Sequence, residues 1–324
     1  MEALALFHVA PRRVEVRELT LAEPGPGEVR VKSLYSAISP GTEKRIFAGD
    51  LPQDLPLDAT LPALAGSFSY PFRYGYALVG EVVAAGPGAE ALLGRRVFLF
   101  HPHQSQTVVA ASQCLPIPED LSGEDALLFA NLESAVNFVH DAAPKLGEQV
   151  LVIGLGVLGV LTAAVLARFP IALYACDPEK RRRSLAEALG ALVFDPVRPL
   201  PPKGGFDLTL ELSGSSQGLE LAIQLTGFAG RLLLGSWYRG KVELDLGGAF
   251  HRSRMRLLAS QVSSIDPELC GRWDKSRRYA LVWEWVRKLR PAQFISHRFP
   301  LEAAQEVFER LEREKLFQPV FIYD

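Results

Sequence analysis

The feature that most limits the fold of this chain is a short apolar strand followed by three spaced glycines and an apolar helix. The stretch Gln149-Val-Leu-Val-Ile-Gly-Leu-Gly-Val-Leu-Gly159 leads into an apolar helix over 160–168. The continuous, β-branched run at 150–153 is typical of a buried parallel strand. In a βαβ unit the first glycine permits a tight turn, the second lets a pyrophosphate approach the backbone, and the third lets the helix pack on the strand. The residues predicted to cradle a dinucleotide are Gly154, Gly156, Val157, Leu158 and Gly159.

An acidic residue stands where the second strand of this unit should end. Asp177 follows the apolar segment 171–176, eighteen residues beyond Gly159. At this place a carboxylate accepts the ribose hydroxyls of NAD and repels the extra phosphate of NADP. The basic run Lys180-Arg-Arg-Arg183 is suited to that phosphate and leaves NADP(H) open. Because Asp177 opposes a phosphate, the sequence favours NAD(H).

Two other interpretations of the same stretch exist. Residues 150–167 carry no charge over eighteen positions, which approaches the length of a membrane span. Three glycines in one turn, without flanking aromatic or basic residues, disfavour a span. The other alternative is a Rossmann unit that binds no dinucleotide, since a fold does not fix a function.

Composition narrows the class of protein. A chain of 324 residues is long enough for about two domains, and its net charge of −2 points to neither nucleic acid nor an anionic membrane surface as partner. Cys114, Cys176 and Cys270 are scattered and form no CxxC pair. This pattern favours a reducing cytoplasm and opposes both a disulfide framework and a cysteine-built zinc site. The N-terminus has no basic segment before its apolar run, so no signal peptide is expected.

The pattern along the chain predicts two kinds of structure. The first ~120 residues look β-rich, with a long Pro/Leu-rich loop at 50–66 and a helix over 123–142. Six strands then alternate with helices, which predicts a doubly wound parallel sheet. The strands are expected at 149–153, 171–176, 191–194, 207–211, 231–234 and 256–261, and the helices at 157–168, 179–189 and 216–226. Beyond ~262 the pattern changes to two helices, 276–289 and 301–311, and a closing strand at 319–323.

The order of several motifs resembles the medium-chain dehydrogenase/reductase family, the zinc alcohol dehydrogenase and quinone reductase group, over essentially the whole chain. The motifs are Ile38-Ser-Pro-Gly-Thr-Glu43, Gly75-Tyr-Ala-Leu-Val-Gly-Glu-Val-Val-Ala-Ala-Gly86, Gly94-Arg-Arg-Val97, Leu146-Gly-Glu-Gln-Val-Leu-Val-Ile-Gly154 and Phe299-Pro-Leu-Glu302. The resemblance implies an α/β fold with a GroES-like β-rich domain at 1–141 and 263–324 and a Rossmann domain at 142–262. It also implies a homodimer paired through 256–261.

The chain departs from this family at the residues that bind the catalytic metal. Zinc alcohol dehydrogenases have a cysteine where this chain has Pro40, and a histidine where it has Tyr76. Glu133 lies near the position of the third ligand. Proline cannot bind a metal and neutral tyrosine is a poor zinc ligand, so no catalytic zinc is expected. A metal site rebuilt from His101, His103 and Glu133 is the alternative, because histidines two apart on a strand share a face.

Loss of zinc changes the expected chemistry. Zinc polarises a carbonyl and lowers the pKa of a bound alcohol, so without it an electron-poor acceptor such as an enone or quinone suits hydride transfer better. Such an acceptor needs orientation and a proton donor. The resemblance places Thr42 at the substrate oxygen and Phe100 on the pocket wall. The candidate catalytic residues are Thr42, Tyr76 and His103, the candidate substrate pocket residues are Phe100 and Glu133, and further cofactor contacts are Ser213, Gly235 and Ser236 at strand ends.

Simpler roles also fit two of these residues: Thr42 as the cap of a turn, and Tyr76 as a side chain that fills the space of a lost metal. The sequence favours a cytoplasmic NAD(P)(H)-dependent, alcohol dehydrogenase-like oxidoreductase with a small-molecule substrate. It transfers hydride to or from a carbonyl, enone, quinone or alcohol. The alternatives are a non-catalytic NAD-binding sensor or structural protein, and a zinc-dependent alcohol dehydrogenase with a rebuilt metal site.

Overall fold

The chain folds as two compact units in a computed structural model that describes residues 1–238 and 240–324. Unit 1 comprises Met1–Ala130 and Val286–Asp324, and unit 2 comprises Asn131–Trp285. Unit 2 begins earlier and ends later than the domain expected at 142–262. The physical reason is a set of contacts that tie Glu133 and Asn137 of one helix to Arg278 of another.

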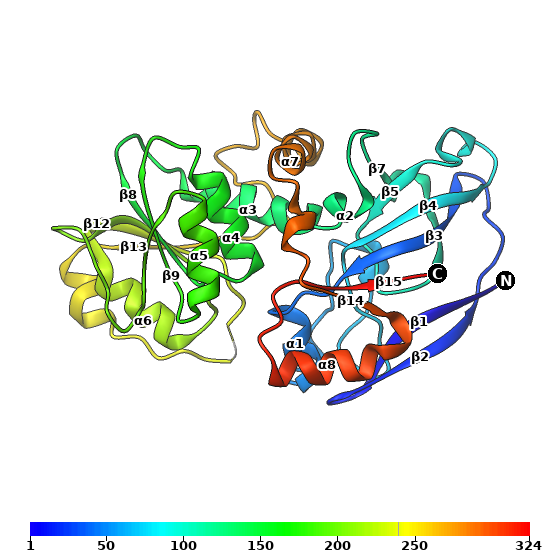
Figure 1. The fold of residues 1–324 in the computed structure, drawn as a ribbon, viewed down its shortest axis with the longest axis horizontal. Helices are drawn as coiled ribbons and strands as arrows, with labels where there is room; N and C mark the ends of the chain where they lie inside the picture. The colour runs from blue at the N-terminus through cyan, green and yellow to red at the C-terminus, as the bar shows by residue number, and fades with distance from the viewer. Residues whose placement is uncertain (239) are drawn as a thin grey trace. The chain divides into compact units, whose positions relative to one another are not determined.

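Unit 2 is built on a six-stranded parallel sheet in the order β10-β9-β8-β11-β12-β13 (Figure 1). All five strand pairs are parallel, which confirms the predicted doubly wound α/β architecture. The strands are β8 (Gln149–Ile153), β9 (Ala172–Cys176), β10 (Leu192–Phe194), β11 (Phe206–Glu211), β12 (Thr226–Leu234) and β13 (Arg256–Ala259). The helices are α3 (Phe129–Ala142), which begins in unit 1, α4 (Val157–Leu166), α5 (Lys180–Ala188), α6 (Ser216–Leu225) and α7 (Lys275–Leu289), which ends in unit 1.

Helix α4 explains the long uncharged run of the sequence. Every residue of this helix except Leu158 is buried, so the helix is apolar on all sides because protein surrounds it. Leu151 and Ile153 of β8 belong to a buried core cluster of the same unit, with Phe206 and Leu232. None of the helices formed by residues 1–238 and 240–324 is long and apolar enough to cross a membrane.

Unit 1 contains a mixed seven-stranded sheet and a separate hairpin of β1 and β2. The sheet has the order β14-β15-β3-β4-β5-β7, and β6 pairs with β3. The strands are β1 (Glu2–Ala10), β2 (Arg13–Thr20), β3 (Glu28–Ala37), β4 (Leu78–Ala85), β5 (Arg96–Leu99), β6 (Gln106–Ala110), β7 (Leu115–Pro116), β14 (His297–Pro300) and β15 (Pro319–Ile322). The helices are α1 (Thr42–Ala48), α2 (Gly123–Ala126) and α8 (Ala304–Arg313). Because β15 pairs with β3, the C-terminal segment returns to the first part of the chain, as the resemblance implied.

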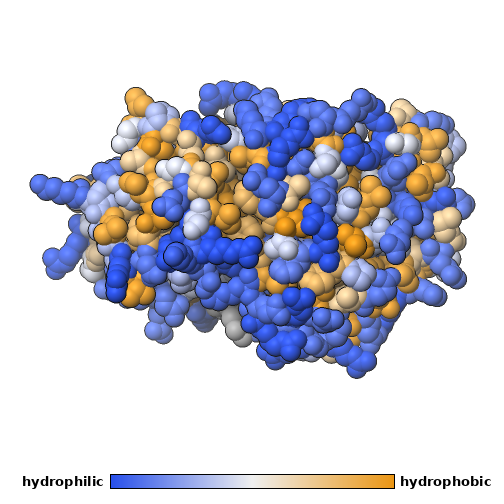
Figure 2. All heavy atoms as spheres, viewed as in Figure 1, coloured by the Kyte–Doolittle hydropathy of each residue, from blue (hydrophilic) through white to orange (hydrophobic). Residues whose placement is uncertain are grey.

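Short turns of 3-10 or π type complete the two units. They are η1 (Pro62–Leu64), η2 (Glu90–Leu92), η3 (Ala111–Gln113), η4 (Leu246–Phe250), η5 (Pro291–Phe294) and η6 (Leu301–Ala303). Figure 2 shows hydrophilic residues over much of the face in view, with apolar residues between them. Most large apolar side chains instead pack in the cores of the two units.

Burial lowers the pKa of two histidines of unit 1, His8 and His101. His8 is fully buried between the rings of Phe72 and Phe308, at centroid distances of 5.1 and 5.5 Å, and neither of its ring nitrogens has a hydrogen-bond partner. Burial, followed by the neighbouring His103, lowers the pKa of His8 to about 3. Burial likewise lowers the pKa of His101 to about 4. Both side chains are therefore neutral at physiological pH.

Acid should destabilise the protein through these two histidines. Their pKa values are about 3 and about 4 in the folded state, below the ordinary 6.5, so as pH falls below 6.5 the unfolded chain binds protons that the folded chain does not. Each histidine should remove roughly 2 kcal/mol from the free energy of unfolding between pH 6.5 and pH 5. Urea unfolding at pH 7 and pH 5 measures the effect. His8→Phe should remove about half of this difference, and an unchanged pH dependence in that variant would contradict the assignment.

Candidate functional site

The glycine loop after β8 is shaped by three different steric demands. Gly154 has a φ of +89°, and a Cβ there would lie 2.5 Å from the backbone nitrogen of Ser213. A Cβ on Gly159 would lie 1.9 Å from the carbonyl oxygen of Gly154, so the helix packs on the loop without room for a side chain. Gly156, the N-cap of α4, is different because a Cβ there would meet nothing within 4 Å. Open space therefore lies over Gly156, next to the unpaired N–H groups of the first helical turn, where an anion binds well.

Asp177 is held against this loop. Its carboxylate accepts hydrogen bonds from the backbone nitrogens of Leu155 and Glu179, both at 2.8 Å, and only 5% of the residue is exposed. The guanidinium of Arg182 lies 3.7 Å from the same carboxylate. Arg183 bonds instead to the carbonyl oxygen of Asp177 and to Asp195. The predicted ribose acceptor is thus fixed in orientation by the glycine loop and has one cation of the basic run beside it.

A buried acid that the sequence analysis did not single out supports the turn after β11. Glu211 is fully buried and accepts hydrogen bonds from the backbone nitrogen and hydroxyl of Ser213 and from the hydroxyl of Tyr238. Burial, together with the bond to Glu211, raises the pKa of Tyr238 far above its ordinary value. The signal for Glu211 was available, since it is an acid at the carboxyl end of a predicted strand. This acid fixes the backbone of Ser213, one of the predicted cofactor contacts.

The turn after β12 is packed against helix α3. A Cβ on Gly235 would lie 2.4 Å from the side chain of Leu212 and 2.8 Å from the ring of Phe138. The hydroxyl of Ser236 lies 3.5 Å from the carbonyl oxygen of Glu211. The predicted cofactor contacts after β11 and after β12 therefore lie together at the carboxyl ends of neighbouring strands, where open α/β sheets bind ligands.

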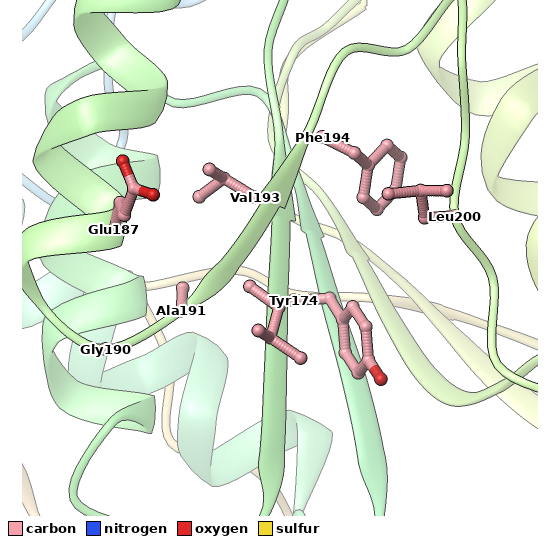
Figure 3. A pocket seen from close by; sticks show the side chains of 8 residues that line it. Tyr174, Glu187, Gly190, Ala191, Val193, Phe194 and Leu200 are labelled. Atoms are coloured by element: carbon pink, nitrogen blue, oxygen red, sulfur yellow. The ribbon is translucent and has the colours of Figure 1, made fainter.

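Unit 2 also has a hollow of about 410 Å³ beside its edge strand β10. Figure 3 shows Tyr174, Phe194 and Leu200 on one side of the strand, and Glu187, Ala191 and Val193 on the other. None of its lining residues belongs to the glycine loop. This hollow is therefore separate from the dinucleotide cradle.

In unit 1 the structure brings together Thr42 and Tyr76, two of the predicted catalytic residues. The side chain of Tyr76 is hydrogen-bonded to those of Thr42 and Ser39, and Ser39 was not predicted. Burial, with a further contribution from the charge of Glu43, raises the pKa of Tyr76 to about 12. Its hydroxyl therefore keeps its proton at physiological pH. Leucines of the 50–66 loop join the same aromatic cluster, so the loop borders Tyr76.

His103, the third predicted catalytic residue, lies deeper in unit 1. It is fully buried, with its Nε2 2.8 Å from Glu43 and its Nδ1 2.6 Å from the hydroxyl of Ser36. Ser36 is in turn 2.7 Å from the hydroxyl of Tyr323, and Glu43 accepts from the backbone nitrogen of Ser39 at 2.7 Å. Any proton that His103 exchanges must pass through these partners. Its direct role in the structure is to hold Glu43, which fixes the turn that carries Ser39.

The two predicted pocket residues have different surroundings. Phe100 is partly exposed and stands edge-on to Phe98 and Phe129, at centroid distances of 5.1 and 6.3 Å. Glu133, in unit 2, is buried and accepts from Arg278 at 2.6 Å and from Lys275 at 2.9 Å.

The side chains at the family's metal positions do not fit a zinc ion. Pro40 has no ligand atom, Tyr76 keeps its proton, and Glu133 is paired with two cations. A metal site rebuilt from His101, His103 and Glu133 fits zinc no better. His101 and His103 follow the end of β5 instead of sharing a strand, and each is hydrogen-bonded within the protein. Across the described parts of the chain, no three His, Cys, Asp or Glu side chains come together in a group that could hold a metal.

Known proteins with similar sequences are dehydrogenases. No protein-family model matches the chain. It is 27% identical to 2-desacetyl-2-hydroxyethyl bacteriochlorophyllide A dehydrogenase of Rhodobacter capsulatus over 95% of this chain and 94% of the relative. It is 29% identical to L-threonine 3-dehydrogenase of Pyrococcus horikoshii over 84% and 92% of the two chains. The structure of 2R,3R-butanediol dehydrogenase from Bacillus subtilis superposes with a TM-score of 0.81 over 99% of this chain and all of the other, at 20% identity.

The two units and the glycine loop define the class: a two-domain oxidoreductase with a GroES-like domain and a Rossmann domain. The sequence relatives and structural neighbours of this chain are members of the zinc-type medium-chain dehydrogenase/reductase family, the family that its sequence motifs resemble.

Proposed function

We propose that this enzyme transfers hydride between NAD(H) and a small carbonyl, enone, quinone or alcohol without a catalytic zinc. The observation that carries the proposal is the open space over Gly156, next to a helix N-terminus and to an acid fixed in orientation. In unit 1, Tyr76 occupies a position at which zinc-dependent relatives have a metal ligand. Its hydroxyl is neutral and is hydrogen-bonded to Thr42 and Ser39.

The residues divide the work between binding and proton transfer. The backbone of the glycine loop binds the pyrophosphate, Asp177 accepts ribose hydroxyls, and the turns at Ser213 and Gly235–Ser236 border the rest of the cofactor. Bound NAD(H) supplies the hydride. Tyr76 holds a proton on its phenolic oxygen for the substrate oxygen, and Ser39 and Thr42 orient that hydroxyl. Glu43 and His103 act behind this group as positioning residues.

Transfer of deuterium from NADH tests the proposal directly. NADH carrying deuterium at both C4 positions is incubated with 2-cyclohexen-1-one or acetoin, whose products keep the deuterium in a C–D bond, and the deuterium in the product is measured by mass spectrometry. Label in any product supports hydride transfer, and retention of the rate after treatment with EDTA supports zinc-free catalysis. Tight NADH binding without transfer to these or to a wider panel of carbonyls and alcohols would favour the alternative of a nucleotide-binding sensor.

We further propose that Asp177 makes the enzyme prefer NAD(H). Asp177→Ala should shift the ratio of affinities at least about tenfold toward NADPH, because it removes a negative charge that repels the 2′-phosphate. Arg182, now 3.7 Å from the carboxylate, would then have a phosphate as its partner. Titration of both cofactors against Asp177→Ala and against Asp177→Ala with Arg182→Ala separates the two effects. An unchanged ratio in the single variant would rule out the ribose role.

We also propose that the enzyme is a homodimer and that it is located in the cytoplasm. β13 is an edge strand of the sheet and exposes Leu257 by 38%, which supports a homodimer that pairs the β13 strands of two copies. Cys114, Cys176 and Cys270 are all free thiols, which supports a reducing cytoplasm. Light scattering coupled to size-exclusion chromatography measures whether the protein is a dimer in solution.

A further inference from the structure

Glu211 stands at the ligand-binding edge of the sheet of unit 2. In the register of the parallel sheet it lies beside Ile153 of β8 and Leu234 of β12, its neighbours on the two sides. The next residues of those two strands are Gly154, the first glycine of the loop, and Gly235. The side chain of Glu211 is fully buried. A buried acid therefore lies between the proposed phosphate cradle and the turn after β12.

The carboxylate of Glu211 accepts hydrogen bonds from four donors. Its Oε1 atom accepts from the backbone nitrogen of Ser213 at 2.8 Å and from the hydroxyl of the same residue. Its Oε2 atom accepts from the hydroxyl of Tyr238 and, at 3.4 Å, from the backbone nitrogen of Gly214. A set of donors of this kind suits an ionised carboxylate, which only accepts hydrogen bonds.

No cation in the parts of the chain that the structure describes forms an ion pair with this carboxylate. The ion pairs of unit 2 involve other acids, among them Glu133, Glu148 and Asp177. The four donors hold the negative charge of Glu211 in place, but they do not neutralise it. Its effect reaches the neighbouring strand ends: burial, followed by the charges of Asp177 and Glu211, raises the pKa of the Cys176 thiol to about 12.

The order of the strands indicates which half of a dinucleotide lies near this charge. The relevant part of the sheet has the order β9-β8-β11-β12. Asp177, the proposed acceptor of the adenosine ribose, follows β9, and the proposed pyrophosphate cradle follows β8. The nicotinamide half is then expected on the other side of β8, over the ends of β11 and β12. Because the nicotinamide ring is neutral in NADH and positively charged in NAD⁺, a fixed negative charge at this place distinguishes the two forms.

We propose that the buried charge of Glu211 makes this enzyme hold NAD⁺ more tightly relative to NADH, and thereby favours the loss of hydride from bound NADH. The inference rests on the proposed function, but only on its cofactor site, and every residue that it uses belongs to unit 2. The negative charge stabilises the positive charge that the nicotinamide ring gains when the hydride passes to the substrate. The equilibrium on the enzyme is displaced toward NAD⁺ and reduced substrate, which is the direction of a carbonyl or enone reductase.

The two affinities, measured separately, test this role without turnover. Glu211→Gln removes the charge and keeps the size of the side chain. The dissociation constant of NAD⁺ divided by that of NADH should rise about tenfold, the order of magnitude for one unit charge that acts through protein. NADH is titrated by fluorescence, and NAD⁺ by competition against NADH.

Two control variants separate charge from shape. Tyr238→Phe removes one hydrogen bond to Glu211 but keeps the charge, so any loss of affinity should be the same for NAD⁺ and NADH. Glu220→Gln makes the same chemical change at an exposed glutamate of α6 and should alter neither affinity. If Glu211→Gln does not fold, Glu211→Gln combined with Tyr238→Phe replaces it, because the new amide then no longer meets the phenolic O–H.

The outcomes separate this inference from the function on which it rests. If the unmodified protein binds neither NAD⁺ nor NADH, both proposals fall. If it binds both and Glu211→Gln weakens them by the same factor, Glu211 only shapes the turn, and the role of its charge is overturned while the proposed function stands. An unmodified enzyme that binds NADH more than about tenfold more tightly than NAD⁺ would overturn that role without any variant.

Discussion

Replacing Gly156 by valine should weaken NADH binding by at least about 100-fold and leave the fold intact. A side chain at this position enters the space in which the pyrophosphate would lie against the backbone, and two charge-assisted hydrogen bonds lost there would cost about 3–6 kcal/mol. The fold should survive because a Cβ on Gly156 meets nothing within 4 Å. Fluorescence titration of NADH and circular dichroism of the variant measure both parts of the expectation.

The neighbouring glycines define the controls for this experiment. Gly271→Val introduces the same side chain at an exposed glycine of unit 2 that also has open space around it, and should not change NADH affinity. Gly159→Val should instead disrupt unit 2, since a Cβ there would lie 1.9 Å from the carbonyl oxygen of Gly154. NADH affinity that is unchanged in Gly156→Val would show that the glycine loop is not the phosphate cradle.

The sheet of unit 2 was predictable because its sequence signals are local. Each strand of a doubly wound sheet is an apolar run bounded by turn residues, and each helix follows within a few residues. All six expected strands are present, β8 with the expected bounds, and the first glycine loop lies where its spacing indicated. The main deviation is β12, which begins at Thr226 instead of 231; its early part contains Gly227 and Gly230, which weaken the strand pattern.

The rest of the fold depends on contacts between distant segments. Strand β1 shows only weak alternation of apolar and polar residues, because alanine and leucine fill most of its positions. The Rossmann domain was expected to end at 262, whereas unit 2 extends to Trp285. Arg278 lies 145 residues from Glu133 along the chain, and no local pattern announces that pair.

In the candidate site, too, some features follow from local sequence signals and others depend on contacts between distant segments. The places of the glycine loop, Asp177 and the turns after β11 and β12 in the fold follow from spacing alone, while their contacts with a dinucleotide stay a prediction. The contact of Tyr76 with Ser39 and the pairing of His103 with Glu43 do not, because these residues are far apart in sequence. A histidine that titrates near neutral pH in water invites a catalytic interpretation. Complete burial instead makes His103 a support for the turn at Ser39–Glu43.

Removing the hydroxyl of Tyr76 should slow hydride transfer by about 100- to 1,000-fold, within the range for loss of a general acid. Tyr76→Phe keeps the ring that fills this part of the aromatic cluster and deletes only the proton donor. NADH affinity should stay within the error of the titration, because the residues proposed to bind the cofactor all belong to unit 2 and Tyr76 belongs to unit 1. Stopped-flow measurement of NADH oxidation by 2-cyclohexen-1-one gives the rate.

The pH dependence of this variant distinguishes a proton donor from a packing residue. With its pKa raised to about 12, Tyr76 stays protonated across the working range, so the rate of the unmodified enzyme should not fall as pH rises from 7 to 9. In Tyr76→Phe the proton must come from solvent, and the slow rate should fall further as pH rises over that range. Tyr70→Phe makes the same change elsewhere in the aromatic cluster and should leave both rate and pH profile unaltered. If Tyr76→Phe retains full rate and a flat profile, the phenol fills space at the abandoned metal position and another group delivers the proton.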